Sequence, residues 1–204
     1  MAQVKAEFLF DFASPNAYFA HCVVPGIAAR TGVAIDYVPV LLGGIFKATN
    51  NQAPMVAFAN VKGKLDYQML EITRFQKRHA ITRFRFNPHF PVNSLAIMRG
   101  AVAARASGVL APYVDAMMRA MWEDGKKMDD PALIREVLAG AGLDADALMQ
   151  AAQSPEIKKA LADNTDAAVQ RGVFGIPTFF VNGEMWFGKD TLRDVEEAIV
   201  GAKA

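Results

Sequence analysis

Ser14 and Pro15 are the residues whose types and position point most directly to chemistry. They follow an apolar, aromatic run at 7–12, typical of a buried strand, and a helical pattern begins immediately after them. Serine is a preferred helix N-cap, and proline is favoured at the first helical position because it has no N–H to satisfy there. Ser14 is therefore predicted to lie at the positive end of a helix dipole, which can stabilise an anion.

Capping alone also explains such a Ser-Pro pair, because a serine hydroxyl caps a helix without any ligand. Dithiol exchange at this helix start would need two sulfurs, one to attack a disulfide and one to release it. The only cysteine, Cys22, is eight residues beyond Ser14, about two turns along the predicted helix. The sequence therefore excludes dithiol oxidoreductase chemistry, internal disulfides and thiol-rich metal sites.

Other classes of site and partner find little support. The three histidines, at 21, 79 and 89, lack the spacing of metal ligands, and His21 belongs to no evident Ser–His–Asp set, so we expect no metal site. The net charge of +1 argues against nucleic acid or an anionic membrane as partner. Without a signal-peptide pattern or an apolar run near 18 residues, the sequence predicts a cytoplasmic protein.

The elements that position Ser14 begin with a βαβ unit. A helix at 15–30 connects the opening strand to a second strand at 33–40, and the two strands are expected to be parallel. Residues 42–54 are rich in glycine and amides and are predicted to form an irregular connection, a kind of segment that often carries function.

Helical patterns then dominate the chain. Apolar residues at 65, 69, 72 and 75 predict a helix that ends near 79, and the arginines at 74, 78, 83 and 85 are typical of a solvated face. Further helices are predicted at 93–107, 109–123, 130–141, 144–152 and 154–171. Two short strands joined by an Asn182-Gly183 turn follow, and Asp190 is predicted to cap a last helix at 191–201.

This order predicts an α/β fold with a four-stranded mixed sheet built from both ends of the chain. The βαβ…ββα order, with a strand entered by residues 175–178 (Gly-Ile-Pro-Thr), resembles the thioredoxin fold with a large all-helical insertion. The predicted boundaries are 1–62 and 172–204 for the thioredoxin-like domain and 63–171 for the helical insertion.

Five stretches, spread over nearly the whole chain, carry a closer resemblance: 11–15 (DFASP), 51–54 (NQAP), 62–67 (KGKLDY), 174–178 (FGIPT) and 185–190 (MWFGKD). With these stretches in the same order, the sequence resembles the DsbA-like branch of that fold, which includes kappa-class glutathione transferases and bacterial 2-hydroxychromene-2-carboxylate isomerases. Ser14 takes the position of the attacking cysteine of DsbA-like oxidoreductases, and Ala17 that of the resolving one. The resemblance therefore implies that the sulfur arrives with a cofactor, glutathione.

The same resemblance assigns roles in glutathione binding. Ser14 would be the catalytic residue, donating a hydrogen bond to the glutathione thiolate, and a cis Ile176-Pro177 bond would offer its backbone to the cofactor. Asn51 and Lys62 would contact its backbone and glycine carboxylate, although Lys64 is an equally placed competitor for Lys62. Lys189 and Asp190 would hold its γ-glutamyl end, with the carboxylate of Asp190 meeting the ammonium.

The sequence departs from the family at the substrate-contacting positions. Phe46-Lys47 replaces a simple lysine pattern, and Phe90 or Val92 stands where a tyrosine is expected. Lys47, Phe90 and Asn93 are our candidates for binding a small aromatic carboxylate substrate, although each also suits a surface, packing or capping role.

The resemblance implies a homodimeric, glutathione-dependent cis–trans isomerase of the 2-hydroxychromene-2-carboxylate type, which acts in aromatic-compound degradation. Two alternatives stay open. A kappa-like glutathione S-transferase would use the same activated thiolate but release a conjugate, and a non-catalytic thioredoxin-like binding protein would have lost the chemistry with its cysteines.

Overall fold

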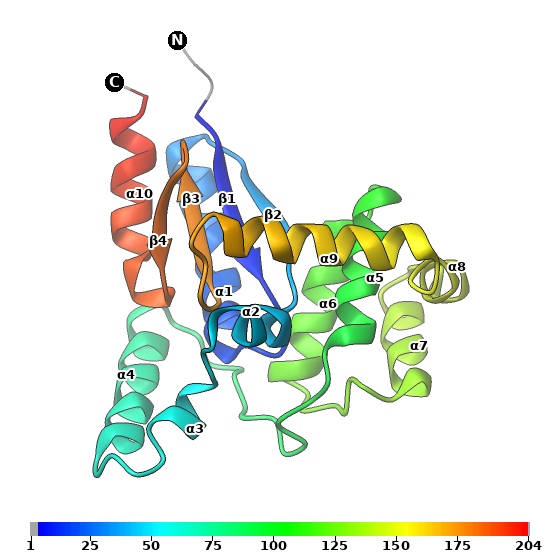
Figure 1. Ribbon diagram of the computed structural model, residues 1–204, viewed down its shortest axis with the longest axis horizontal. Coiled ribbons are helices and arrows are strands. Elements are labelled where there is room, and N and C mark those ends of the chain that lie inside the picture. Colours follow the sequence, from blue (N-terminus) through cyan, green and yellow to red (C-terminus); the bar gives the residue numbers. More distant parts are fainter. Residues whose placement is uncertain (1–3, 204) are drawn as a thin grey trace.

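The computed structural model describes residues 4–203 and contains one mixed sheet, which lies toward the left in Figure 1. Its strand order is β2-β1-β3-β4. Strand β1 (Ala6–Phe10) pairs in parallel with β2 (Ile35–Pro39) and antiparallel with β3 (Thr178–Val181), which in turn pairs antiparallel with β4 (Glu184–Phe187). The four-stranded mixed sheet predicted from the two ends of the chain is confirmed.

Strand β1 is apolar apart from Glu7, which pairs with Arg171, because both faces of the sheet are covered there. All five of its residues are buried, and on one face Phe8 stacks on Phe179 with ring centroids 5.0 Å apart and meets Tyr37 edge-on at 4.9 Å. A near-continuous apolar run is typical of a strand buried on both faces. This central strand delivers the chain to Ser14.

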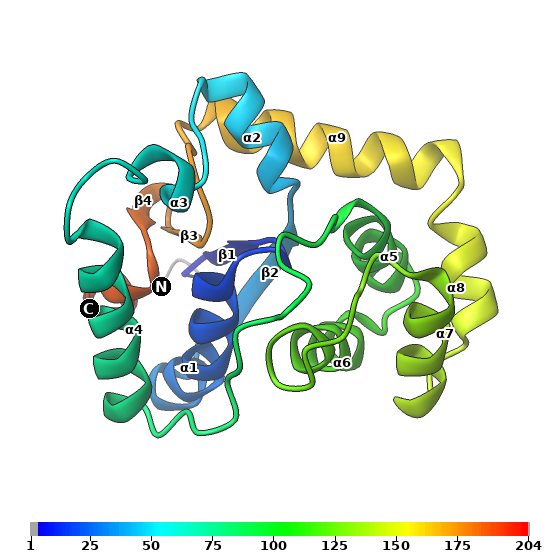
Figure 2. The same ribbon diagram turned by 90° about the horizontal axis from the view of Figure 1, so that it is seen from below.

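The predicted helices are confirmed, with ends shifted by a few residues. Helix α1 (Pro15–Thr31) follows β1, and α10 (Leu192–Gly201) packs beside it. Figure 2 shows α4 on one side of α1 and α5–α8 on the other. The remaining helices are α2 (Leu42–Thr49), α3 (Pro54–Ala57), α4 (Lys64–Arg78), α5 (Leu95–Ala106), α6 (Leu110–Trp122), α7 (Pro131–Gly140), α8 (Ala145–Ala151), α9 (Pro155–Gln170) and the 3-10 turn η1 (Lys189–Thr191).

Two local predictions were wrong. Most of the segment 42–54 is helical, since α2 spans residues 42–49 and includes both glycines of the segment. Asn50 closes the helix with a left-handed φ of 53°. Asp190 does not cap the last helix. The η1 turn comes first, so α10 begins at Leu192, one residue after the predicted start, and its N-cap position is Thr191. Asp190 instead pairs with Lys189.

The insertion occupies the chain between β2 and β3, but the domain boundaries given above stay a prediction. Over residues 4–203 we find no helix with both the length and the apolar character needed to cross a membrane.

Candidate functional site

Ser14 lies at the turn between β1 and α1, as predicted. Its backbone is extended (φ −96°, ψ 114°), and its hydroxyl oxygen accepts a hydrogen bond of 3.2 Å from the backbone N–H of Ala17. Only 5% of the residue is exposed. The capping role is therefore confirmed, and the hydroxyl is held at the positive end of the α1 dipole.

The same hydroxyl contacts the far end of the chain. It donates a hydrogen bond of 3.2 Å to the carbonyl oxygen of Ile176, and the Ile176-Pro177 peptide bond is cis. Ser14 thus lies between the start of α1 and the segment Phe174–Pro177, which we call the 174–177 loop. Two backbone groups share this one hydroxyl.

The 174–177 loop brings other predicted site residues together. The Asn51 side-chain amide donates to the carbonyl oxygen of Phe174 at 2.8 Å, and the N–H of Gly188 donates to the carbonyl oxygen of Pro177 at 2.9 Å. Gly188 immediately precedes Lys189 and Asp190. Hydrogen bonds therefore connect this loop directly to Ser14 and Asn51, and through Gly188 to the start of η1.

Lys189 and Asp190 form an ion pair with unequal exposure. The lysine Nζ lies 2.6 Å from Oδ2 of Asp190 and 5.0 Å from the ring centroid of Phe75 in α4. The Lys189 side chain is 5% exposed, whereas that of Asp190 is 63% exposed. Asp190 opens onto a cavity of about 210 Å³, whose other lining residues all come from α4: Tyr67, Glu71, Arg74, Phe75 and Arg78.

None of the charged α4 residues of this cavity is a predicted site residue, and Arg74 and Arg78 were expected on a solvated face. Glu71, Arg74 and Arg78 follow Tyr67 at intervals of four, three and four residues, which place all of them on one face of α4. That spacing was the available signal, but it does not reveal what lies opposite the face.

Lys62 lies in the turn before α4 and is exposed. It makes no hydrogen bond or ion pair with another residue in the described part of the chain. Its competitor Lys64 is engaged, since its Nζ lies 5.4 Å from the centroid of the Phe58 ring. The structure thus leaves Lys62 the freer of the two amines.

Asp11 is a fully buried carboxylate that joins three segments. Its Oδ1 accepts from the N–H of Ala13 at 2.9 Å, its Oδ2 accepts from the N–H of Leu42 at 2.8 Å, and the Ser94 hydroxyl also bonds to it. Ala13 precedes Ser14, Leu42 begins the helix that carries Lys47, and Ser94 follows Asn93, so Asp11 links the segments of three predicted site residues. Burial raises the pKa of Asp11, and these hydrogen bonds only partly oppose that effect.

The three substrate candidates have different environments. Lys47 is exposed on α2, and Phe90 is half-buried, with its ring 5.3 Å from Phe86 and 6.0 Å from Trp122. Asn93 is exposed, and its side-chain oxygen accepts from the N–H of Leu95 at 3.0 Å, at the start of α5. Their role in binding substrate stays a prediction.

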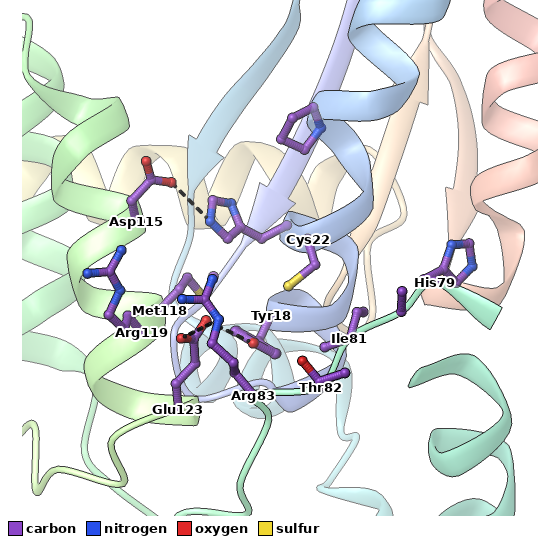
Figure 3. A pocket seen from close by; sticks show the side chains of 13 residues that line it. Tyr18, Cys22, His79, Ile81, Thr82, Arg83, Asp115, Met118, Arg119 and Glu123 are labelled. Atoms are coloured by element: carbon purple, nitrogen blue, oxygen red, sulfur yellow. Dashed lines mark hydrogen bonds and ion pairs between the residues drawn. The ribbon is translucent and has the colours of Figure 1, made fainter. Parts of the chain in front are cut away.

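A larger pocket, about 380 Å³, lies further along α1, between that helix, α6 and residues 79–83 (Figure 3). His21 Nε2 is 3.1 Å from Asp115 there, and the Tyr18 hydroxyl donates to Glu123 at 3.1 Å. Cys22 also lines the pocket, and burial raises the pKa of its thiol, so this sulfur is not activated. None of the predicted site residues lines this pocket.

His21 therefore has an acidic partner that the sequence did not reveal, but no serine lines the same pocket. Within residues 4–203 there is no group of three or more histidine, cysteine, aspartate or glutamate residues placed to hold a metal ion.

Known proteins of similar sequence and structure share this architecture. Residues 5–200 match the family model of the DSBA-like thioredoxin domain. The chain is similar to the 2-hydroxychromene-2-carboxylate isomerase of Pseudomonas sp. (strain C18), with 32% identity over 98% of this chain and 92% of the relative. It is also similar to human glutathione S-transferase kappa 1, with 24% identity over 92% of this chain and 87% of the relative.

A solved structure of a 2-hydroxychromene-2-carboxylate isomerase superposes with a TM-score of 0.84 and 30% identity, over 97% of this chain and 95% of that one. The chain belongs to the DsbA-like thioredoxin family, in the branch of the 2-hydroxychromene-2-carboxylate isomerases and kappa-class glutathione transferases.

Proposed function

We propose that this protein is a glutathione-dependent cis–trans isomerase of the 2-hydroxychromene-2-carboxylate type, acting on a small aromatic carboxylate in aromatic-compound degradation. The position of the Ser14 hydroxyl carries the proposal, because it lies both at the start of α1 and against the 174–177 loop. The similarity to 2-hydroxychromene-2-carboxylate isomerases supports the reaction type.

The residues around the 174–177 loop fit glutathione, a peptide that carries charged groups at both ends. Ser14 and the α1 N-terminus would face the thiolate, and Ile176 would offer its backbone. Asn51 and Lys62 would hold the glycine side, and Lys189 with Asp190 would hold the γ-glutamyl side. When bound, glutathione supplies a thiolate that can add to a conjugated alkene, permit rotation and leave again.

Ser14 and the helix end can supply the stabilisation that a thiolate needs. An ordinary thiol has a pKa near ~8.5, and lowering it by about two units takes roughly 2.7 kcal/mol. A helix N-terminus contributes ~0.3–2 kcal/mol, and one hydrogen bond to a charged partner contributes ~1.5–3 kcal/mol. No cationic neighbour and no ionisation of Ser14 are required.

Ser14 has only one proton to donate, and in this structure it goes to the carbonyl oxygen of Ile176. Stabilising an anion therefore requires the O–H bond to turn away from that carbonyl. The carbonyl oxygen is then free to accept from an amide of the cofactor, so neither group loses a partner.

Product analysis tests the proposal. With 2-hydroxychromene-2-carboxylate as substrate, we expect many molecules of the trans isomer for each glutathione molecule, and no consumption of glutathione. Depletion of glutathione with accumulation of a conjugate would instead establish a kappa-like transferase.

A binding protein without chemistry would give no product in that assay. Absence of thermal stabilisation by millimolar glutathione would count against all glutathione-dependent functions, since a ligand at 100 times its Kd adds about 2.7 kcal/mol of stability.

Two further parts of the proposal concern location and assembly. A glutathione-dependent enzyme suits the cytoplasm, where a reduced glutathione pool is maintained. A second copy of the chain would cover an apolar surface on α3, α4 and the turn between them, which we call the α3–α4 surface. Its exposed members are Met55, Val56, Val61, Met69 and Leu70.

A further inference from the structure

We propose that helix α4 recognises the amino-acid end of glutathione, with Glu71 and Arg74 acting together with Asp190 on its α-ammonium and α-carboxylate groups. This inference rests on the proposed function and adds specificity-determining residues to it. The cavity of about 210 Å³ between α4 and Asp190 is the observation behind it.

The charges in this cavity match those of an α-amino acid. Its lining holds two carboxylates, Glu71 and Asp190, and two guanidinium groups, Arg74 and Arg78. An α-amino acid presents one ammonium and one carboxylate side by side. Protein carboxylates bind the ammonium, and the planar guanidinium of an arginine binds the carboxylate with two parallel hydrogen bonds.

These α4 side chains are available for a ligand. Glu71, Arg74 and Arg78 form no ion pair or hydrogen bond with another residue in the range 4–203, although Glu71 and Arg74 lie within one turn of each other. The Arg74 guanidinium lies 6.0 Å from the centroid of the Tyr67 ring, which supports the planar group from one side. Asp190 is already paired through Oδ2, but its side chain is 63% exposed.

The position of α4 is fixed where it faces η1. Phe75 lies on the same face as the charged residues and is 3% exposed. Its ring packs against Phe19 of α1, with centroids 5.7 Å apart, and lies 5.0 Å from the buried amine of Lys189. Because Phe75 is anchored, Arg74, which directly precedes it, and Glu71, one turn earlier, are held near Asp190.

Hydrogen bonds also link the Ser14 region to the start of η1, the turn that carries Asp190. Ser14 bonds to Ile176, and the next residue, Pro177, accepts from Gly188, just before η1. One continuous stretch of backbone contacts thus runs from the proposed thiolate position to the cavity.

Binding of two peptides by calorimetry separates this role from others. Cysteinylglycine lacks the γ-glutamyl residue, so it serves as the probe that cannot reach α4. Arg74→Gln and Glu71→Gln should each raise the Kd for glutathione by about 5- to 50-fold, the range expected for losing one charged hydrogen-bonding partner. The Kd for cysteinylglycine should stay unchanged in both variants.

Arg193→Gln is the matched control. Arg193 is an exposed helical arginine on α10 that pairs with Glu197 and lies outside the cavity. We expect this variant to bind both peptides like the wild type.

The outcomes distinguish the two proposals. Wild-type protein that binds no glutathione overturns the proposed function and this inference with it. If the wild type binds glutathione but both α4 variants bind it equally well, this inference alone is wrong. An equal loss of affinity for glutathione and cysteinylglycine would also overturn it, because that pattern indicates a structural role for α4.

Discussion

The hydroxyl of Ser14 lies 3.2 Å from the carbonyl oxygen of Ile176, although 162 positions separate the two residues in the sequence. The Ser14 hydroxyl oxygen also accepts a hydrogen bond from the backbone N–H of Ala17 at the start of α1. One side chain therefore joins the first helix to the loop before the third strand. Any change at Ser14 affects the folding free energy as well as the proposed chemistry.

Ser14→Ala should lower the glutathione-dependent isomerisation rate by about 10- to 100-fold, because a hydrogen bond to a charged group contributes ~1.5–3 kcal/mol. Steady-state kinetics at saturating glutathione measure this effect. A Ser14→Ala variant that isomerises 2-hydroxychromene-2-carboxylate as fast as the wild type would refute the role assigned to Ser14.

Ser154→Ala provides the matched control for loss of a cap. Ser154 also precedes a proline and accepts from the N–H of Ile157 at 3.3 Å at the start of α9. Ser154→Ala should lose about 0.5–2 kcal/mol of unfolding free energy in urea titrations, as expected for removal of a serine cap. Ser14→Ala should lose at least as much, because its hydroxyl also donates a hydrogen bond to Ile176. Only Ser14→Ala should lose activity.

Lys62→Ala should weaken glutathione binding by about two- to fivefold, since an exposed ion pair contributes ~0.2–1 kcal/mol. The difference from the wild type should shrink as salt is added, because screening reduces such interactions. Lys64→Ala should bind glutathione normally, because that amine is occupied over the Phe58 ring. The reverse result would transfer the predicted role to Lys64.

Asp11 should make the protein less stable as the pH rises. Burial raises its pKa in the folded state above the ordinary value of 3.8, so between these two values the folded chain binds more protons than the unfolded chain. The folded state therefore loses stability as the pH climbs through this window, by at most about 1.4 kcal/mol per pH unit.

The variant Asp11→Asn tests this sign. It loses a hydrogen-bond acceptor, so it should be less stable than the wild type at pH 4, and the difference in unfolding free energy should narrow toward neutral pH. Urea titrations at several pH values measure that difference. A gap that widens with pH would mean that the charged carboxylate is stabilised in the fold, contrary to our interpretation.

Leu70→Glu should convert the proposed homodimer to a monomer. Leu70 is 53% exposed on the α3–α4 surface, and a carboxylate placed in an apolar interface is costly to desolvate. Sedimentation should then give the 22.2 kDa of one chain instead of two. Val200→Glu, at a 55% exposed position on α10, should leave the dimer intact. A wild type that sediments as a monomer would end the homodimer proposal.

The sheet and most helices could be predicted because their signals are local. The run at 7–12, the Asn182-Gly183 turn and the helical periodicity each indicate their element without knowledge of the rest of the chain. The prediction of a loop at 42–54 was wrong because its glycines and amides are typical of loops. The burial of Ile45, which supports α2, depends on tertiary contacts that the local sequence does not show. The prediction that Asp190 caps the last helix was wrong because an aspartate before a helical pattern can also lie within a short 3-10 turn, as it does here in η1.

The candidate site was harder to predict because its neighbours come from distant parts of the chain. The spacing of Glu71, Arg74 and Arg78 shows that they share a face, and such a face is typical of a solvated helix. Only the fold places Asp190 opposite them. The resemblance to a family supplied Asn51, Lys62 and Lys189, whereas local sequence rules identified Ser14 as a helix cap at a place that suits an anion, without indicating glutathione.

The pairing of β1 with β3 has a consequence for synthesis of the protein. A ribosome releases residue 14 long before residue 176, so the nascent chain can form α1 and its cap while the Ile176 carbonyl has not yet been made. The insertion helices are translated in between. A chain arrested before Phe174 would lack both the 174–177 loop and β3, so the contact between Ser14 and Ile176 can form only after that loop has been translated.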